Sequence, residues 1–345
     1  MHRSVSLAEK TYWENECAPE NSGAGDQRAW DCPARIFPAM ADVTIIINPA
    51  AGGGRARALL GAIESAFEPL RPRYVISAGP RGEERLAKEA AAGGAETIVA
   101  VGGDGTWGNV AHGIVQSGAS PRLALLAAGT GNDFAKSAGV PATDPRATAE
   151  LVRRGGERRV DLGTIAGRVF LNCCGTGFDT AVLTRNARLP LLRGPIRYMA
   201  AALTELFTYR SEPVSLSPWI DDDERDTLLT VFANGAWYGG MFHIAPHASP
   251  EDGMLDAIRI RGARGAGRLA LLVSAVRGKH LGRKGVEFGR GPTFTLGFPA
   301  PPLVNTDGEV RLATTSTLTV STLPRALRLV AHHRDVTPAG AESPG

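Results

Sequence analysis

Three glycine-rich turns in the first half of the chain each follow a short apolar run and precede a helical segment. They are residues 48–54 (NPAAGGG), 102–106 (GGDGT) and 129–134 (GTGNDF). At the carboxyl ends of neighbouring parallel strands, such turns direct backbone N–H groups and helix N-termini into one crevice, where they bind phosphate oxygens. A single turn of this kind is usually just a tight strand–helix connection. Three on consecutive units, two of them carrying an Asp and a Thr, predict a polyphosphate site.

Asp104 is the candidate for balancing the charge of those phosphates. The chain has neither the dinucleotide-binding GxGxxG motif with its acidic partner nor the GxxxxGK[ST] motif with its lysine. A divalent cation held by Asp104 would supply positive charge, because hard cations take carboxylate and phosphate oxygens. The alternative is that Asp104 closes a turn or caps the helix that follows it. We favour the metal-assisted contact.

A second pair of carboxylates, Asp307 and Glu309, flanks Gly308 near the end of the chain. Two carboxylates on one turn suit a general base or a metal site. Taken alone, this triplet is better interpreted as an Asp-Gly hairpin turn with solvated charges. The preference reverses when it is considered with the other motifs of the chain.

Five motifs, in this order, resemble the diacylglycerol kinase catalytic domain family, the bacterial diacylglycerol and lipid kinases related to sphingosine kinases. They are residues 101–106 (VGGDGT), 129–135 (GTGNDFA), 175–179 (GTGFD), 252–255 (DGML) and 305–309 (NTDGE). The resemblance implies an ATP-dependent lipid kinase that uses Mg²⁺ and phosphorylates a primary hydroxyl of a diacylglycerol-like or sphingoid lipid. One alternative is an NAD kinase-like nucleotide kinase, which shares GGDGT but is disfavoured by the later motifs. The other is a catalytically silent nucleotide- or lipid-binding regulator, against which the intact Asp104 and Asp307 weigh.

The same resemblance implies roles for individual residues. Asp307 or Glu309 would be the base that accepts the lipid hydroxyl proton, and Mg²⁺ would bridge the phosphates near Asp104. Ser77 stands where the family usually has threonine, and Asn109 where bacterial members usually have glutamate. The residues expected to hold ATP between the domains are Asn48, Ser77, Gly102, Gly103, Asp104, Gly105, Thr106, Gly129, Thr130, Asn132 and Asp133. A second, structural Mg²⁺ site is expected at Asp252, the carbonyl of Met254 and Ser249, with Glu251 as a substitute for Ser249.

The hydrophobic pattern predicts two domains. Apolar runs at 43–47, 73–76, 97–101 and 123–126 alternate with helical segments that include 83–92 and 106–115, which predicts an α/β domain with a mainly parallel sheet. Beyond about residue 159 the apolar residues recur at period two, which predicts an all-β-rich, sandwich-like second domain. One helix, at 195–209, is expected to interrupt it, and 326–330 to return to the first domain.

The nucleotide is expected in the cleft between these domains. The expected organisation is a disordered extension at 1–40, a nucleotide-binding domain at 41–158 plus 323–333, a lipid-binding domain at 159–322 and a disordered tail at 334–345.

Composition restricts the partners. The 345 residues carry 38 basic and 35 acidic side chains, for a net charge of +3, a balance that does not favour nucleic-acid binding. The longest apolar runs, such as 269–276, fall short of the roughly 20 residues that span a bilayer, so membrane contact would be peripheral. Four cysteines without metal-ligand spacing indicate a reducing, cytoplasmic compartment. A homodimer is left open.

The helix at 195–209 is the candidate lipid contact. Leucines and aromatic residues are interleaved there and just before it with Arg185, Arg188, Arg193 and Arg197, a composition suited to anionic headgroups. The alternative is a core helix with a solvated basic end.

Overall fold

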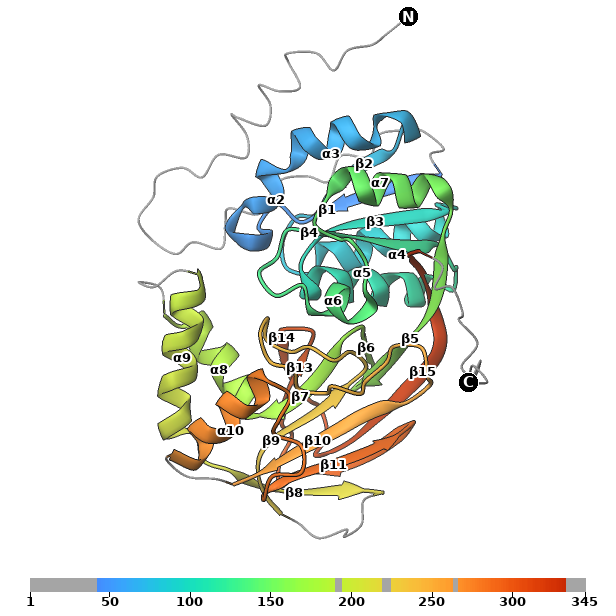
Figure 1. Cartoon of the computed structure of the whole chain (residues 1–345). Helices are drawn as coiled ribbons and strands as arrows, with labels where there is room; N and C mark the ends of the chain where they lie inside the picture. The colour runs from blue at the N-terminus through green and yellow to red at the C-terminus, as the bar shows by residue number, and fades with distance from the viewer. Residues whose placement is uncertain (1–41, 190–193, 219–224, 263–265, 333–345) are drawn as a thin grey trace, which may run out of the picture.

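The computed structural model describes residues 42–189, 194–218, 225–262 and 266–332, with the backbone alone at 194–199 and 266 (Figure 1). The expectations for residues 1–40 and 334–345 fall outside these ranges, as do the side chains of Arg193 and Arg197. Within the described ranges no helix is long and apolar enough to cross a membrane.

A parallel sheet with helices on both faces forms the first half of the fold (Figure 1). Its elements are β1 (Val43–Ile47), η2 (Ala51–Gly53), α2 (Arg55–Ala58), α3 (Leu60–Phe67), η3 (Glu68–Leu70), β2 (Arg73–Ile76), α4 (Gly82–Ala92), β3 (Thr97–Gly102), α5 (Asp104–Ser117), β4 (Arg122–Ala127), α6 (Asp133–Ala138) and α7 (Pro145–Arg154). The strands lie in the order β2–β1–β3–β4 and pair in parallel. Helices α4 and α5 cover one face through Leu86 and Trp107, and α3 and α7 cover the other through Phe67 and Leu151. The four predicted strands are confirmed to within one residue.

Two long strands, β5 (Glu157–Ile165) and β15 (Thr317–Val330), run antiparallel to each other from the parallel sheet into the second half. The C-terminal end of β15, where the chain was expected to return to the first domain at 326–330, pairs in parallel with β4 at Arg328 and Leu329. The expected boundaries near residues 159 and 323 therefore fall inside continuous strands and not inside linkers.

The second half is an antiparallel β structure, as predicted. Its further strands are β6 (Arg168–Phe170), β7 (Cys173–Gly177), β8 (Glu212–Ser217), β9 (Arg225–Ala233), β10 (Leu255–Arg261), β11 (Val286–Gly291), β12 (Thr293–Gly297), β13 (Leu303–Thr306) and β14 (Glu309–Leu312). Phe170, Phe232 and Phe294 are buried together in the core that these strands enclose. A second core cluster joins strand β9 to three helices through side chains such as Val182 and Leu206.

Those three helices are α8 (Phe178–Ala187), α9 (Gly194–Thr208) and α10 (Ala266–Val276), which lie on one side of the second half (Figure 1). The predicted helix at 195–209 is confirmed as α9, but the expectation of a single helix is wrong. Helix α8 begins inside the GTGFD motif, and α10 contains the apolar run 269–276. Helix α10 has no clear amphipathic pattern, because it carries apolar residues on its outer face as well as its inner one.

Candidate functional site

The three glycine-rich turns meet at one edge of the parallel sheet, beyond the carboxyl ends of β1, β3 and β4. Asn48 Nδ2 donates to Thr106 Oγ1 at 3.0 Å, and Arg55 Nη1 donates to the carbonyl of Gly129 at 2.9 Å. The second and third turns touch directly, since a Cβ built on Gly129 would lie 2.6 Å from the Cα of Gly103. Only glycine permits so close an approach of two backbones. The three turns therefore form one continuous surface of backbone groups.

Three more residues expected to hold nucleotide surround this surface. Ser77 is buried, and its hydroxyl donates to Glu83 Oε1 at 2.9 Å. Burial raises the pKa of Glu83. Thr130 is exposed on the third turn, and Asn132 has a left-handed backbone (φ 54°) with its amide donating to the carbonyl of Gly129 at 3.3 Å. Thr130 is thus the most accessible of the three to a ligand.

Asp104 opens helix α5 and connects the second turn to the helix after the third. Its Oδ1 accepts the backbone N–H of Phe134 at 3.0 Å, while Oδ2 faces the backbone of Gly131. Burial, and then the charge of Asp133, raise the pKa of Asp104. Because the surroundings do not neutralise this carboxylate, a divalent cation bound beside it fits the charge of the site. Asp104 therefore neither caps α5, whose N-cap is Gly103, nor closes a local turn. It bonds to the start of α6, 30 residues away, and its role toward a metal stays a prediction.

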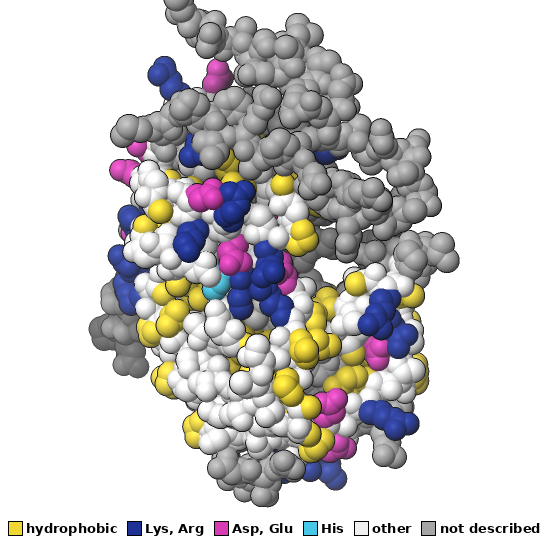
Figure 2. Space-filling model, turned by 180° about the vertical axis from the view of Figure 1, so that it is seen from behind, with side chains coloured by type: hydrophobic (Ala, Val, Ile, Leu, Met, Phe, Trp, Pro, Cys, Tyr) yellow, Lys and Arg dark blue, Asp and Glu magenta, His cyan; other side chains and the backbone are white. Residues whose placement is uncertain are grey.

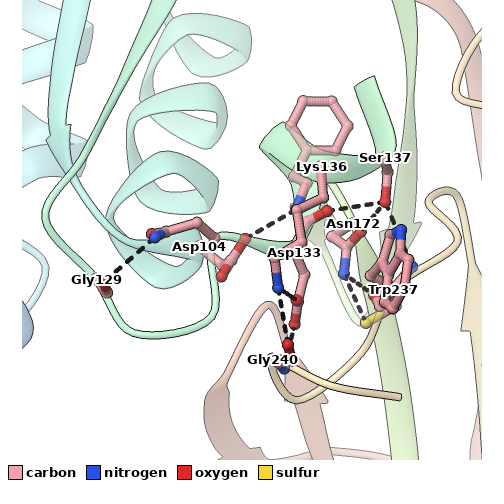
Figure 3. A network of polar contacts seen from close by, with 11 residues as sticks. Asp104, Gly129, Asp133, Lys136, Ser137, Asn172, Trp237 and Gly240 are labelled. Atoms are coloured by element: carbon pink, nitrogen blue, oxygen red, sulfur yellow. Dashed lines mark hydrogen bonds and ion pairs between the residues drawn. The ribbon is translucent and has the colours of Figure 1, made fainter. Parts of the chain in front are cut away.

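Asp133 joins the third turn to the second half of the molecule (Figure 3). Its Oδ1 accepts a hydrogen bond from Lys136 Nζ at 3.0 Å, and its Oδ2 accepts the backbone N–H of Gly240 at 2.8 Å. Lys136 also donates to the carbonyl of Gly240 at 2.8 Å, and nearby Asn172 Nδ2 donates to the carbonyl of Trp237 at 2.8 Å. One oxygen of a residue expected to hold nucleotide thus bonds directly to the second half, and the other bonds Lys136, which itself donates to the second half.

The Asp-Gly-Glu turn of the second half reaches back to helix α5. A Cβ built on Gly108 would lie 2.7 Å from Asp307 Oδ2, so a side chain at 108 would displace the carboxylate. That carboxylate accepts the backbone N–H groups of Leu171, Asn172 and Cys173 at 2.7, 2.9 and 3.1 Å. Burial raises the pKa of Asp307 to about 7 in spite of these donors. Asp307 is thus a buried residue whose carboxylate accepts three backbone N–H groups.

Glu309 is the accessible carboxylate of the turn, with 33% of its side chain exposed. Its Oε1 accepts from Asn109 Nδ2 and its Oε2 from Arg311 Nη2, both at 2.8 Å. Arg168 Nη2 in turn donates to Asn109 Oδ1 at 3.0 Å, which orients the amide so that its N–H group faces Glu309. The neutral amide at the family's usual glutamate position is therefore a hydrogen-bond donor to Glu309.

A charged network behind Glu309 was not predicted from the sequence. Arg168 Nη1 contacts Glu84 Oε2 at 2.6 Å. Burial of Glu84 acts to raise its pKa, but the hydrogen bond and the positive charge of Arg168 outweigh burial and lower the pKa of Glu84. Burial, followed by the charge of Arg168, lowers the pKa of His112 to about 4. Figure 2 shows basic and acidic side chains gathered at mid-height on the rear face. No local motif marks these residues. The only indication of the network in the sequence was Asn109, which stands where the family usually has glutamate.

The expected structural Mg²⁺ site lies apart from the turns, just before β10. Asp252 Oδ1 accepts the backbone N–H of Met254 at 2.9 Å, and Oδ2 contacts the guanidinium of Arg290. Glu251, the substitute ligand, is paired with Arg158 at 2.6 Å. In the described part of the chain, no group of three His, Cys, Asp or Glu side chains is placed to hold a metal ion. The guanidinium of Arg290 thus lies where the expected metal ion would contact Asp252, and the ligand set of Asp252, Met254 and Ser249 stays a prediction.

A cavity of about 790 Å³ lies in the second half between α8, α9 and the β13–β14 hairpin. Its walls include Thr180 and Ala181 of α8, Tyr209 after α9, and Leu303 and Leu312 of the hairpin. Leu303 pairs with Leu312 at one end of this hairpin, and Thr306 pairs with Glu309 at the other. Four residues of strand extend roughly 10 Å between their first and last Cα atoms. The cavity and the accessible carboxylate are therefore at opposite ends of β14.

Comparisons with known proteins agree with this geometry. A family model described as the diacylglycerol kinase catalytic domain matches residues 42–165, and one described as the YegS C-terminal NAD kinase beta sandwich-like domain matches 172–331. The chain is 31% identical over 301 residues to a diacylglycerol kinase of Mycobacterium tuberculosis, covering 84% of this chain and 94% of that one. It is 28% identical over 271 residues to a diacylglycerol kinase of Bacillus subtilis, covering 77% and 88%. A crystal structure of a diacylglycerol kinase from Bacillus anthracis shares the fold, with a TM-score of 0.61 at 20% identity, covering 85% and 97%.

Replacing Gly129 with alanine tests whether the touching turns bind nucleotide. The added Cβ would meet backbone atoms of Gly103, which move only with both turns, so we expect Gly129→Ala to weaken Mg-ATP binding at least tenfold by calorimetry. Gly61→Ala is the matched control, because nothing lies within 4 Å of a Cβ there and alanine favours a helix by about 1 kcal/mol. An unchanged Kd for a folded Gly129→Ala protein would place the nucleotide elsewhere.

Proposed function

This chain belongs to the diacylglycerol kinase catalytic domain family, a family of lipid kinases, and on that premise we propose that it transfers the γ-phosphoryl group of ATP to a primary hydroxyl of a diacylglycerol-like or sphingoid lipid. The observation that carries the proposal is the contact of the Asp-Gly-Glu turn with helix α5. This contact places the accessible carboxylate of Glu309 against helix α5, which begins in the second glycine-rich turn. Glu309 bonds there to Asn109, which is 200 residues away in the sequence.

The phosphate turns have the groups that a triphosphate needs. Residues 102–106 present backbone N–H groups at the start of α5, where the helix dipole also favours negative charge. Thr130 lies exposed beside them on the third turn. A divalent cation, in our proposal Mg²⁺ held by Asp104, would neutralise charge on the transferred phosphoryl group. The role of the turns is then to fix the phosphates in position.

We assign the general base to Glu309 rather than Asp307. A base must be reachable by the proton that it accepts, and Glu309 is partly exposed whereas Asp307 is buried with three backbone donors on its carboxylate. Each oxygen of Glu309 accepts one hydrogen bond from the protein and retains capacity for another. A lipid hydroxyl can donate to that free position.

The reaction then proceeds with a simple balance of atoms. The lipid hydroxyl oxygen forms the new P–O bond, and the bond between the γ-phosphorus and its bridging oxygen breaks, leaving ADP. The hydroxyl proton moves to the Glu309 carboxylate and from there to solvent. In a loose phosphoryl-transfer transition state the alcohol needs no early deprotonation, so a positioned carboxylate is sufficient.

The cavity at the far end of β14 suits the hydrocarbon part of the acceptor. Its volume of about 790 Å³ falls in the range of roughly 300–1,000 Å³ typical of small-molecule sites. Leu303, Leu312 and Ala181 supply apolar wall, and Thr180 a hydroxyl. A hydrocarbon chain in the cavity and a lipid hydroxyl near Glu309 would lie at the two ends of β14. A lipid acceptor requires such an arrangement, because its hydroxyl and its hydrocarbon chain are at opposite ends of the molecule.

We further propose that the protein works in the cytoplasm, at the membrane surface where its acceptor resides. Helix α9, expected from the sequence to contact lipid, exposes Leu203 and Phe207 to 46% and 74%. Its inner side supplies Glu205 to the cavity. One helix thus separates the cavity from an apolar outer surface.

Glu309→Gln and Asp307→Asn separate the two carboxylates. Loss of a general base typically costs about 10²–10⁴ in rate, so Glu309→Gln should lose that much lipid phosphorylation with an unchanged ATP Kd. Asp307→Asn should instead lower the free energy of unfolding by about 1–3 kcal/mol, because an amide cannot satisfy all three backbone donors. The assay is transfer from labelled ATP to diacylglycerol in micelles, with NAD as an alternative acceptor. Wild-type turnover by Glu309→Gln, or transfer to NAD alone, would contradict the proposal.

Asn109→Asp tests the amide beside the base. A second carboxylate within hydrogen-bond distance of Glu309 disfavours the ionised base, so the acid limb of the pH–rate profile should move to higher pH by about one unit. Activity near pH 6 should fall more than activity near pH 9. Asn109→Ala is the control, which removes the donor without adding charge and should move the limb less. Superimposable profiles for all three proteins would show that the amide does not act on the base.

A further inference from the structure

Helix α10 presents an apolar face to solvent. Leu269, Val273 and Val276 are 46%, 52% and 40% exposed, and their spacing places them along one side of the helix. Arg268 and Ala275 are buried on the other side. Among the side chains described from 267 to 276, Arg268 is the only charged one, so the outer face carries no charge. Exposed apolar stripes of this kind mark surfaces that bind something.

A basic segment follows this face directly. Arg277, Lys279, Arg283 and Lys284 are all exposed, and the sequence from 261 to 286 contains no Asp or Glu. The segment is ordered because His280 is fully buried, with its Nε2 2.9 Å from the carbonyl of Ile244. Four cations are therefore grouped after the end of the apolar stripe, and no acidic residue of the same segment neutralises them.

Helix α9 adjoins this surface. The guanidinium of Arg268 donates to the carbonyls of Leu206 and Tyr209, each at 2.9 Å, which joins the start of α10 to the end of α9. The exposed Phe207 and Leu269 are the chain neighbours of these bonded residues, so each lies where the two helix ends meet. Figure 1 shows α8, α9 and α10 on the same side of the second half.

We propose that the outer face of α10 and the basic segment 277–284, together with the end of α9, form a docking surface for an anionic lipid bilayer. Apolar side chains would enter the headgroup boundary while the cations contact anionic headgroups, a combination that describes interfacial helices. The charge pattern favours a bilayer over a second copy of the chain, since a symmetric dimer would bring two basic segments of like charge to one interface. The proposed kinase function supplies the reason why the protein would dock on a membrane. The docking itself is tested independently, because vesicle binding is measured without turnover.

Sedimentation of the full chain with vesicles tests this surface. The vesicles are phosphatidylcholine alone or phosphatidylcholine with about a third phosphatidylglycerol, at low and high salt. Each basic residue near an anionic surface contributes about fivefold in binding, so Arg277→Gln with Lys279→Gln should weaken partitioning to anionic vesicles about twenty- to thirtyfold. Val273→Asp should weaken it at least tenfold. The matched control is Lys88→Gln with Arg146→Gln, two exposed cations of the first half, which should bind as wild type.

Unchanged partitioning of both test variants, or equal binding to neutral vesicles without salt dependence, would overturn the docking surface. Light scattering gives a second measurement, since a dimer that Val273→Asp dissociates would assign the face to a second copy. Phosphorylation of lipid in detergent micelles keeps the two proposals apart. If docking fails, micellar turnover persists, and if the kinase proposal fails, the wild-type chain still binds anionic vesicles.

Discussion

The buried carboxylate of Asp307 holds the parts of the site in one place. It accepts three backbone N–H groups from residues 171–173 at the start of β7, and its Oδ2 faces Gly108 of helix α5. The hairpin β13–β14, strand β7 and the helix after the GGDGT turn are thereby fixed to one another. A carboxylate hidden from water is costly unless its oxygens are bonded. This cost gives the arrangement its specificity, because the three backbone donors converge on the carboxylate only in the folded protein. Glu309 lies two residues further along the chain, so the contacts of Asp307 with residues 171–173 and Gly108 fix its position.

A second set of contacts sets how the two halves meet. The Asp133 carboxylate accepts a hydrogen bond from the backbone N–H of Gly240, and Lys136 donates one to the carbonyl of the same residue. Together with the two long strands β5 and β15, these contacts limit how far the halves can move apart. Residues of the GTGNDFA motif therefore serve two purposes in our account. Its glycine touches the second phosphate turn, and its aspartate joins the turn to the opposite half of the molecule.

The strands of the first half could be predicted because each is a short, mainly apolar run, and three of the four end in a glycine-rich turn, a signal that is local in the sequence. The assembly of the three turns could also be predicted, since parallel strands place their carboxyl ends at one edge. Helix α10 could not, because its outer face is as apolar as its inner face and so gives no periodic contrast. The choice between Asp307 and Glu309 was equally out of reach. It depends on backbone donors about 135 residues away, and Arg168, which orients Asn109, belongs to no motif.

A crystal structure of the chain with Mn²⁺ and a non-hydrolysable ATP analogue tests the central claim, that the turns bind the triphosphate and that Glu309 is the carboxylate facing it. Anomalous scattering locates the metal independently of the protein. The account predicts Mn²⁺ beside Asp104, phosphates on the backbone of residues 102–106 and the γ-phosphate facing Glu309, with Asp307 still bonded to residues 171–173. A triphosphate bound away from these turns, or Asp307 released to face the γ-phosphate in place of Glu309, would contradict it.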